Sequence, residues 1–140
     1  MKVCVQEQDF DLSMEVNSMR KNAKVGAIAT FTGVVREVAM TLEHYPGMTE
    51  KALRKIVDEA ARRWQVLDCT VIHRHGSLKP TDQIVLVAVA SAHRGDAFAA
   101  CEFIMDYLKT QAPFWKKEEG RGWVEARAAD DAAAQRWSKS

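Results

Sequence analysis

Basic side chains stand where predicted elements of this chain begin or end. The stretch from Val89 to Lys117 starts as an apolar strand, turns at a basic pair and continues as a helix that ends near another cation. Backbone N–H groups and the dipole at a helix N-terminus favour anions, and nearby cations add to that preference. We therefore predict anion binding by the cations of this stretch and of an earlier strand end, which are Arg36, His93, Arg94, Lys109, Lys116 and Lys117.

Several of these cations also have an ordinary structural interpretation. Lys109 follows Asp106 by three residues, so the two could pair on the helix surface, and a lysine near a helix C-terminus is favourable in any case. Lys116 and Lys117 could belong to a solvated hairpin. Spacing alone therefore leaves both the structural and the catalytic interpretation open.

The length of the predicted helix limits what its two ends can do together. Arg94 and Lys109 are fifteen residues apart in sequence. At about 1.5 Å per residue, the helix between them is about 22 Å long. Side chains so far apart cannot meet around one small anion. Either they serve different ligands, or a second copy of the chain in a symmetric dimer brings one end beside the other.

Composition limits the possible classes of protein. The chain has 140 residues, a net charge of +1, and 47% apolar and 28% charged residues, as expected of one globular domain over residues 1–140. The balanced charge argues against a general nucleic-acid binder. The N-terminus lacks the apolar core of a signal peptide, and no run is long enough to cross a membrane. We expect a cytoplasmic protein.

The residues that commonly bind metals do not form a pattern typical of a metal site. Cys4, Cys69 and Cys101 are odd in number and have no C-x-x-C spacing, so we predict neither a disulfide framework nor a zinc site. His73 and His75 could share a strand face, but no third ligand accompanies them at a suitable spacing. We therefore predict no metal and no cofactor.

Alternation and β-branched residues predict a series of strands. Gly33 predicts a bulge or a close backbone approach in the second strand, and the short gap after that strand predicts a tight antiparallel hairpin with the third. The last strand is continuously apolar, which predicts a central position covered on both faces. Leu12, Met14 and Val16 show no clear period, so no element is predicted there. The predicted strands are residues 1–10, Lys24–Arg36, Met40–Tyr45, Cys69–Arg74 and Ile84–Ala90.

Two helices and a hairpin complete the expected elements. An apolar stripe predicts a helix capped by Thr49 that reaches Trp64, with a charged face toward solvent. We predict that Asp96 caps a second helix, which ends near Lys109 because a proline follows. A hairpin turning at Glu119–Gly122 and a frayed alanine-rich helix should come next. Strands and helices do not alternate strictly, which predicts an α+β domain with a mostly antiparallel sheet.

Several unusual strings resemble one family in the right order. The chain is similar over most of residues 25–127 to the large, catalytic subunit of molybdopterin synthase. The strings LEHYPGM and MDYLKTQAPFWK are long enough to make this resemblance specific. The similar segments are FTGVVR (31–36), TLEHYPGMTEKAL (41–53), VIHRHGSL (71–78), SAHRGDAF (91–98), FIMDYLKTQAPFWKKE (103–118) and WVEAR (123–127).

This resemblance implies a fold, a reaction and partners. The fold would be an α/β hammerhead with an added β-subdomain. The enzyme would be a sulfurtransferase that converts cyclic pyranopterin monophosphate (precursor Z) to molybdopterin by installing the dithiolene sulfurs. Sulfur would arrive as the C-terminal thiocarboxylate of a small ubiquitin-like subunit. Two large subunits would form a central homodimer within a heterotetramer, with no nucleic acid or membrane involved.

The resemblance also assigns roles to individual residues. Lys109, in the string DYLK, is the principal catalytic candidate, and Lys116, in FWK, is the second. Val34 stands where relatives carry a basic residue, so it would act through its backbone, and the loop after Arg36 is short. The implied substrate contacts are Val34, Val35, Arg36, His93, Arg94, Lys109, Lys116, Lys117 and Glu118, with Arg127 as a further basic candidate.

Two other classes of function remain open from the residues themselves. A non-catalytic dimer that holds a phosphorylated ligand or a partner's C-terminal tail would also need clustered cations. A hydrolase acting on a cyclic phosphate is a weaker alternative. Formation of the dithiolene separates the synthase from a binder, and sulfur-independent ring opening would identify the hydrolase.

Overall fold

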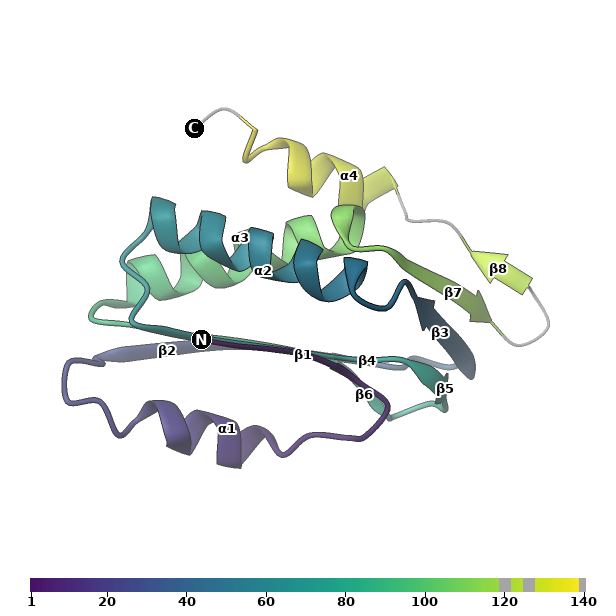
Figure 1. Cartoon of the computed structure of the whole chain (residues 1–140), viewed down its shortest axis with the longest axis horizontal. Coiled ribbons are helices and arrows are strands. Elements are labelled where there is room, and N and C mark those ends of the chain that lie inside the picture. The colour runs from purple at the N-terminus through teal and green to yellow at the C-terminus, as the bar shows by residue number, and fades with distance from the viewer. Residues whose placement is uncertain (119–121, 125–127, 139–140) are drawn as a thin grey trace.

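The computed structural model describes residues 1–118, 122–124 and 128–138, which form two sheets and a set of helices (Figure 1). The predicted α+β class is confirmed. The elements in chain order are β1 (Lys2–Gln6), α1 (Leu12–Met19), β2 (Ala27–Val34), β3 (Met40–His44), α2 (Met48–Arg63), β4 (Asp68–Arg74), β5 (Gly76–Leu78), β6 (Gln83–Ser91), α3 (Arg94–Gln111), β7 (Phe114–Glu118), β8 (Gly122–Val124) and α4 (Ala128–Gln135).

The sheets are mostly antiparallel, as predicted. The first has the strand order β1-β4-β6-β2, and its β1–β4 pair is parallel while its other pairs are antiparallel. The second has the order β5-β3-β7-β8, with antiparallel pairs throughout. This smaller second sheet fits the added β-subdomain that the family resemblance implied.

Strand β6 organises the core, as its continuous apolar sequence predicted. It lies between β4 and β2, and its residues from Val85 to Ser91 are buried. Because side chains alternate along a strand, Val85, Val87 and Val89 join the core that contains α2 and α3 residues. Their neighbours Leu86, Ala88 and Ala90 join the core on the other face, which α1 covers (Figure 1).

The predicted hairpin between β2 and β3 is wrong. Strand β2 pairs with β6, whereas β3 pairs with β5 and β7 in the other sheet. The pairing of β2 shifts register between Gly33 and Val34, so the predicted bulge is confirmed. Beyond it, the Val35 N–H donates to the Asp82 carbonyl at 2.9 Å, and Glu37 has a φ of 68°. The chain therefore crosses to the second sheet.

Helix α1 lies where the sequence predicted no element. Its N-terminus is capped by Asp11, whose side chain accepts a hydrogen bond from the Met14 N–H at 3.1 Å. One face is buried through Met19 and Glu15, and the Glu15 carboxylate pairs with Lys2 Nζ at 2.6 Å. The helix is short and its apolar spacing is weak, so its cap and its tertiary contacts stabilise it.

Both predicted helix caps are wrong by a few residues. Gly47 is the cap of α2, and its N–H donates to the Glu50 carboxylate at 3.1 Å. Thr49 is instead fully buried, and its hydroxyl donates to the Tyr45 carbonyl at 2.9 Å. His93 is the cap of α3, and Asp96 in its first turn accepts a hydrogen bond from the backbone N–H of Gln65. Asp96 therefore ties α3 to the segment after α2.

The C-terminal segment packs on α3. Strands β7 and β8 form the predicted hairpin, although residues 119–121 of its predicted turn lie outside the described residues, and α4 confirms the predicted helix. Arg136 pairs with Glu102 and Asp106, and Trp137 Nε1 donates to the Asp106 carboxylate at 2.5 Å. The Trp137 ring also packs edge-on against Phe103. The carboxylate of Asp106 is thus engaged by the C-terminal segment.

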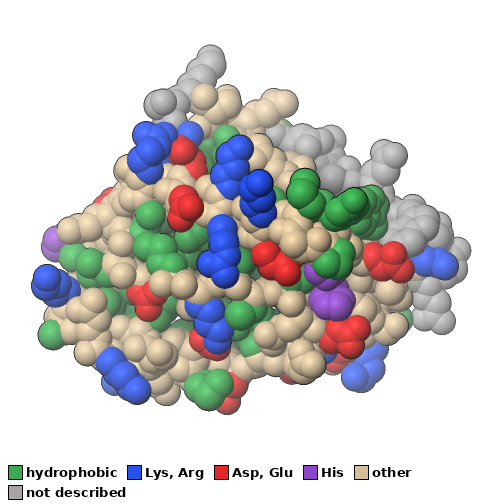
Figure 2. Space-filling view, viewed as in Figure 1, with side chains coloured by type: hydrophobic (Ala, Val, Ile, Leu, Met, Phe, Trp, Pro, Cys, Tyr) green, Lys and Arg blue, Asp and Glu red, His purple; other side chains and the backbone are tan. Residues whose placement is uncertain are grey.

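Charged side chains of both signs share the described surface (Figure 2), and two of the three cysteines are buried. Acidic and basic side chains are mixed over the face in Figure 2, and no described helix is long and apolar enough to cross a membrane. The three cysteines are unpaired. Burial raises the pKa of the Cys69 thiol to about 12 and that of Cys101 to about 11. Both side chains lie in the main core.

Candidate active site

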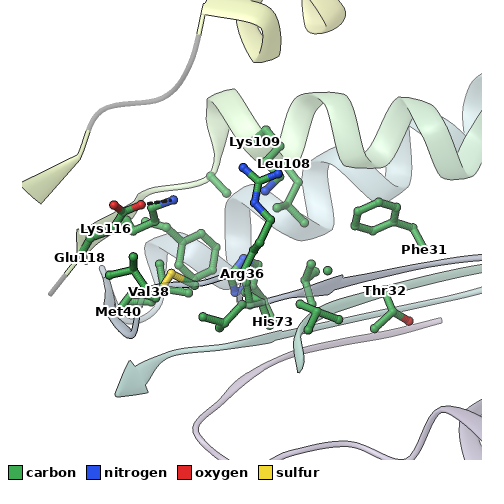
Figure 3. A pocket seen from close by; sticks show the side chains of 18 of the residues that line it. Phe31, Thr32, Arg36, Val38, Met40, His73, Leu108, Lys109, Lys116 and Glu118 are labelled. Atoms are coloured by element: carbon green, nitrogen blue, oxygen red, sulfur yellow. Dashed lines mark ion pairs between the residues drawn. The ribbon is translucent and has the colours of Figure 1, made fainter. Parts of the chain in front are cut away.

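A cavity of about 740 Å³ lies where the two sheets meet, at the C-terminal end of α3. Figure 3 shows side chains from both sheets and from α3 around it. Its walls come from the end of β2 and the following segment, from β3, β4, β6 and β7, and from the last turns of α3. The charged and histidine side chains that line it are Arg36, Glu37, His73, Lys109, Lys116 and Glu118.

The bulge at the end of β2 directs Arg36 to this cavity. A Cβ at Gly33 would lie 2.9 Å from a methyl carbon of Val85, so any side chain at this point of close approach would force the neighbouring atoms to shift. Val35 is then held by its N–H to Asp82 and by the Thr81 N–H that donates to its carbonyl at 2.9 Å. Arg36 is exposed and extends toward Lys109 in Figure 3. The short loop after Arg36 still places its guanidinium at the cavity.

Two other elements bring the lysines and a carboxylate to the same cavity. Lys109 lies in the last turn of α3 and lines the wall. Lys116 and Glu118 lie two apart on β7, so they share a face, and the Lys116 Nζ pairs with a Glu118 carboxylate oxygen at 3.2 Å. Because the Glu118 side chain is only 14% exposed, this pair is partly withdrawn from water and holds the ammonium in place.

Some of the predicted site residues do not meet the others within one chain. Val34 and Val35 line the cavity, whereas Lys117 does not, because alternation on β7 turns it to the opposite, exposed side. His93 and Arg94 lie at the far end of α3 and do not line the cavity either. Arg127 lies outside the described residues. The cavity therefore holds only part of the predicted set.

His73 lines the cavity, although its sequence position suggested only a weak metal pair with His75. Its ring is 5% exposed and stacks on the Phe114 ring of β7, with centroids 3.7 Å apart. Among the described residues, no group of three or more His, Cys, Asp or Glu side chains could hold a metal ion. The useful sequence signal was alternation, which turns His73 away from Arg74 and toward the second sheet.

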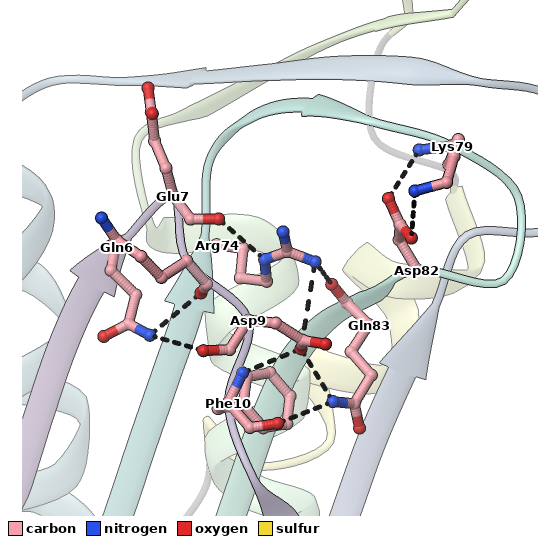
Figure 4. Close-up of polar contacts among 9 residues, drawn as sticks. Gln6, Glu7, Asp9, Phe10, Arg74, Lys79, Asp82 and Gln83 are labelled. Atoms are coloured by element: carbon pink, nitrogen blue, oxygen red, sulfur yellow. Dashed lines mark hydrogen bonds and ion pairs between the residues drawn. The ribbon is translucent and has the colours of Figure 1, made fainter.

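The strand end that carries His73 is fixed by a polar network (Figure 4). Arg74 Nε donates to the Glu7 carbonyl at 2.9 Å, and its Nη1 donates to the Gln83 carbonyl at 3.0 Å. Gln83 in turn donates to the Asp9 carboxylate and to the Phe10 carbonyl. These bonds join β4, β6 and the segment after β1, so the backbone beside His73 has little freedom.

Burial, with a smaller contribution from the positive charge of Lys109, lowers the pKa of His73 to about 4. The hydrogen bond to the Arg74 carbonyl opposes this shift. His73 is therefore a neutral imidazole at neutral pH, placed beside cations.

The low pKa of His73 predicts a pH-dependent stability. Between pH 6.5 and 4 the unfolded chain binds a proton that the native state does not, so the free energy of unfolding should fall as the pH drops. The contribution of His73 is about 3 kcal/mol, lost progressively over this window. Urea unfolding at a series of pH values should show a shallower dependence for His73→Phe than for the wild type. Equal slopes would contradict the assignment.

Comparisons with known proteins agree with this architecture. Residues 5–111 match the family described as MoaE protein. A relative from Ralstonia nicotianae, named molybdopterin synthase catalytic subunit, is 59% identical over 144 residues, covering 95% of this chain and 82% of the relative. The structure of a molybdopterin biosynthesis MoaE protein from Burkholderia ambifaria has a TM-score of 0.88 at 59% identity and covers 100% of both chains.

A more distant structure has the same fold. Molybdopterin synthase from Staphylococcus aureus superposes with a TM-score of 0.79 at 34% identity, covering 86% of this chain and 94% of that one. The MoaE family match spans most of this chain, and the alignments with the relatives from Ralstonia nicotianae and Burkholderia ambifaria cover nearly all of it. This chain belongs to the MoaE protein family.

Proposed function

We propose that this chain is the catalytic subunit of a molybdopterin synthase. It would transfer sulfur from the C-terminal thiocarboxylate of a small ubiquitin-like subunit to cyclic pyranopterin monophosphate. The observation that carries the proposal is the cavity in which Arg36 from the segment after β2, Lys109 from α3 and Lys116 from β7 come together. Family membership and the names of the relatives support it.

The side chains of the cavity suit this substrate. A cyclic phosphate needs cations, and an arginine can bind its oxygens through two parallel hydrogen bonds, so we assign phosphate binding to Arg36. A volume of about 740 Å³ lies within the range of small-molecule sites. The apolar lining from Val35, Met40 and Leu108 offers a surface for the flat pterin rings.

The thiocarboxylate is itself the nucleophile, so the sulfur transfer requires the protein to assist proton transfer. The thiocarboxylate sulfur attacks a substrate carbon and forms a C–S bond, while a C–O bond at the same carbon breaks and its oxygen leaves with a proton. Water then cleaves the acyl–sulfur bond, leaving the tail as a carboxylate and the sulfur on the substrate. We assign tail positioning and acid–base work to Lys109, because neighbouring cations can lower the pKa of a lysine. Lys116, held by Glu118, would stabilise the negative charge that develops.

The assembly and location are part of the same proposal. A relative named as a catalytic subunit belongs to an enzyme of more than one subunit, which supports a small partner for this chain. We propose that residues 1–140 act as one domain, in the cytoplasm, as a homodimer of large subunits within a heterotetramer. His93, Arg94 and Lys117 remain substrate-binding candidates that would act from outside the cavity of their own chain. Arg127, which lies outside the described residues, also remains a candidate.

The decisive experiment is reconstitution of the reaction. The purified chain should be mixed with thiocarboxylated small subunit and precursor Z, and the products followed by mass spectrometry. We expect molybdopterin together with small subunit that has lost its sulfur. Binding of both partners without any dithiolene would instead identify a non-catalytic module. Ring opening without the thiocarboxylate would identify a hydrolase.

A further inference from the structure

His73 is a second functional feature of the cavity, distinct from its cations. Of the four histidines in the chain, it alone lines the cavity, and Figure 3 shows it at the base of the site, below Arg36 and Lys109 in that view. Its ring belongs to β4 in the first sheet, whereas Phe114, on which it stacks, belongs to β7 in the second. The stacked pair therefore joins the two sheets at the floor of the cavity.

The hydrogen bonding of His73 determines which ring nitrogen faces the cavity. Nδ1 lies 2.8 Å from the Arg74 carbonyl oxygen. A carbonyl can only accept, so Nδ1 carries the proton and Nε2 of the neutral ring has a lone pair. Among the described residues, no buried side-chain nitrogen or oxygen lacks a hydrogen-bond partner. Nε2 has no partner within the described chain, so it is not sealed in the core, and because His73 lines the cavity we infer that Nε2 faces it.

We propose that His73 binds the substrate through Nε2, which accepts a hydrogen bond from an N–H or O–H group of the pterin. This inference rests on the proposed function and adds a specificity contact to it. Arg36, Lys109 and Lys116 can only donate, so they recognise the anionic part of the ligand. Glu118 is engaged by Lys116. His73 supplies an uncharged acceptor for the donor groups that a pterin also presents.

The surroundings of His73 keep this acceptor available. Burial and the Lys109 charge hold the pKa of the ring at about 4, so Nε2 retains its lone pair at neutral pH. The Phe114 stack and the Arg74 bond fix the ring plane and its rotation. A substrate donor therefore meets an acceptor whose position is set before binding.

Three variants separate acceptance of a hydrogen bond from ring packing. His73→Phe keeps a flat ring that can stack on Phe114 but removes the acceptor. His73→Gln removes the ring and can restore an acceptor near the position of Nε2. His75→Phe is the matched control, because His75 contacts the His44 ring but does not line the cavity. Each variant should be assayed with saturating thiocarboxylated small subunit and varied precursor Z, after circular dichroism has established folding.

We expect His73→Phe to raise the KM for precursor Z by about tenfold, with kcat changed by less than about threefold. His73→Gln should recover at least part of this loss, and His75→Phe should match the wild type. A KM for His73→Phe within about twofold of the wild type would overturn the proposal. The wild type in the same assay tests the proposed function separately. If the wild type forms no dithiolene, the proposed function fails, whereas the His73 contact does not fail by that result.

A direct measurement covers the case in which His73→Phe does not fold. Nitrogen-15 spectra of the wild-type imidazoles should show one ring whose Nε2 is unprotonated in the free protein, assigned by comparison with His73→Gln. Saturating precursor Z, without the small subunit, should move that resonance in the direction of a hydrogen-bonded nitrogen. A resonance that stays in place while precursor Z binds would refute the contact.

Discussion

Replacing Lys109 with alanine should abolish dithiolene formation while leaving binding of the small subunit measurable. The side chain lies in the last turn of α3, at the wall of a cavity that also holds Arg36 and Lys116. A helix embedded in the core gives it a fixed position beside the incoming thiocarboxylate. Loss of proton transfer by a positioned side chain typically costs about 10²- to 10⁴-fold in rate. Single-turnover formation of molybdopterin, followed by mass spectrometry, measures this loss.

Two companion variants test whether proton transfer or charge alone is lost. Lys109→Arg keeps a positive charge but cannot release a proton near neutral pH, so it should remain strongly impaired if Lys109 does acid–base work. Lys55→Ala removes an exposed lysine from the solvated face of α2 and should leave turnover unchanged. Small-subunit affinity should be measured by calorimetry for each variant. Turnover of Lys109→Ala close to that of the wild type would rule out the catalytic role.

The fold was predictable wherever a local pattern determined the structure. The apolar run of β6 and the stripe of α2 indicated their types and their burial correctly. Helix α1 was missed because its stability comes from the Asp11 cap and from contacts with the sheet, neither of which produces a clear apolar period. The β2–β3 hairpin was wrongly predicted because a short gap favours local pairing. The backbone bonds of Val35 to the Thr81–Asp82 turn override that preference.

The sequence predicted individual residues of the candidate site but not how they are arranged in space. Family strings pointed to Arg36, Lys109, Lys116 and Glu118, and the structure places all four at one cavity. Alternation separates the His73 side chain from that of Arg74, but it could not show that His73 belongs to the site, because this depends on β4 and β7 meeting across two sheets. Those strands are brought together by long-range pairing of β3 with β7 and of β4 with β6.

The two basic ends of α3 lie far apart within one chain, which predicts a substrate site shared between two chains. His93 and Arg94 begin the helix and Lys109 lies in its last turn, so one chain cannot place all of them around one small substrate. In a symmetric dimer, the beginning of one α3 could complete the cavity at the end of the other. Arg94→Ala and Lys109→Ala homodimers should then both be inactive, although each chain retains one intact half of the site.

Heterodimers of these two variants should regain activity. One of their two sites would combine both substitutions, whereas the other would combine the intact Lys109 of one chain with the intact Arg94 of its partner. Heterodimers purified through two different affinity tags should therefore show about half the activity of wild-type dimers. Heterodimers of an Arg94→Ala chain and a Lys55→Ala chain are the control for effects of the tags. They should retain one site in which both Arg94 and Lys109 are intact. If the purified double-tagged heterodimers remain inactive, the two ends of α3 act in separate sites. Combining chains could then not restore a complete site.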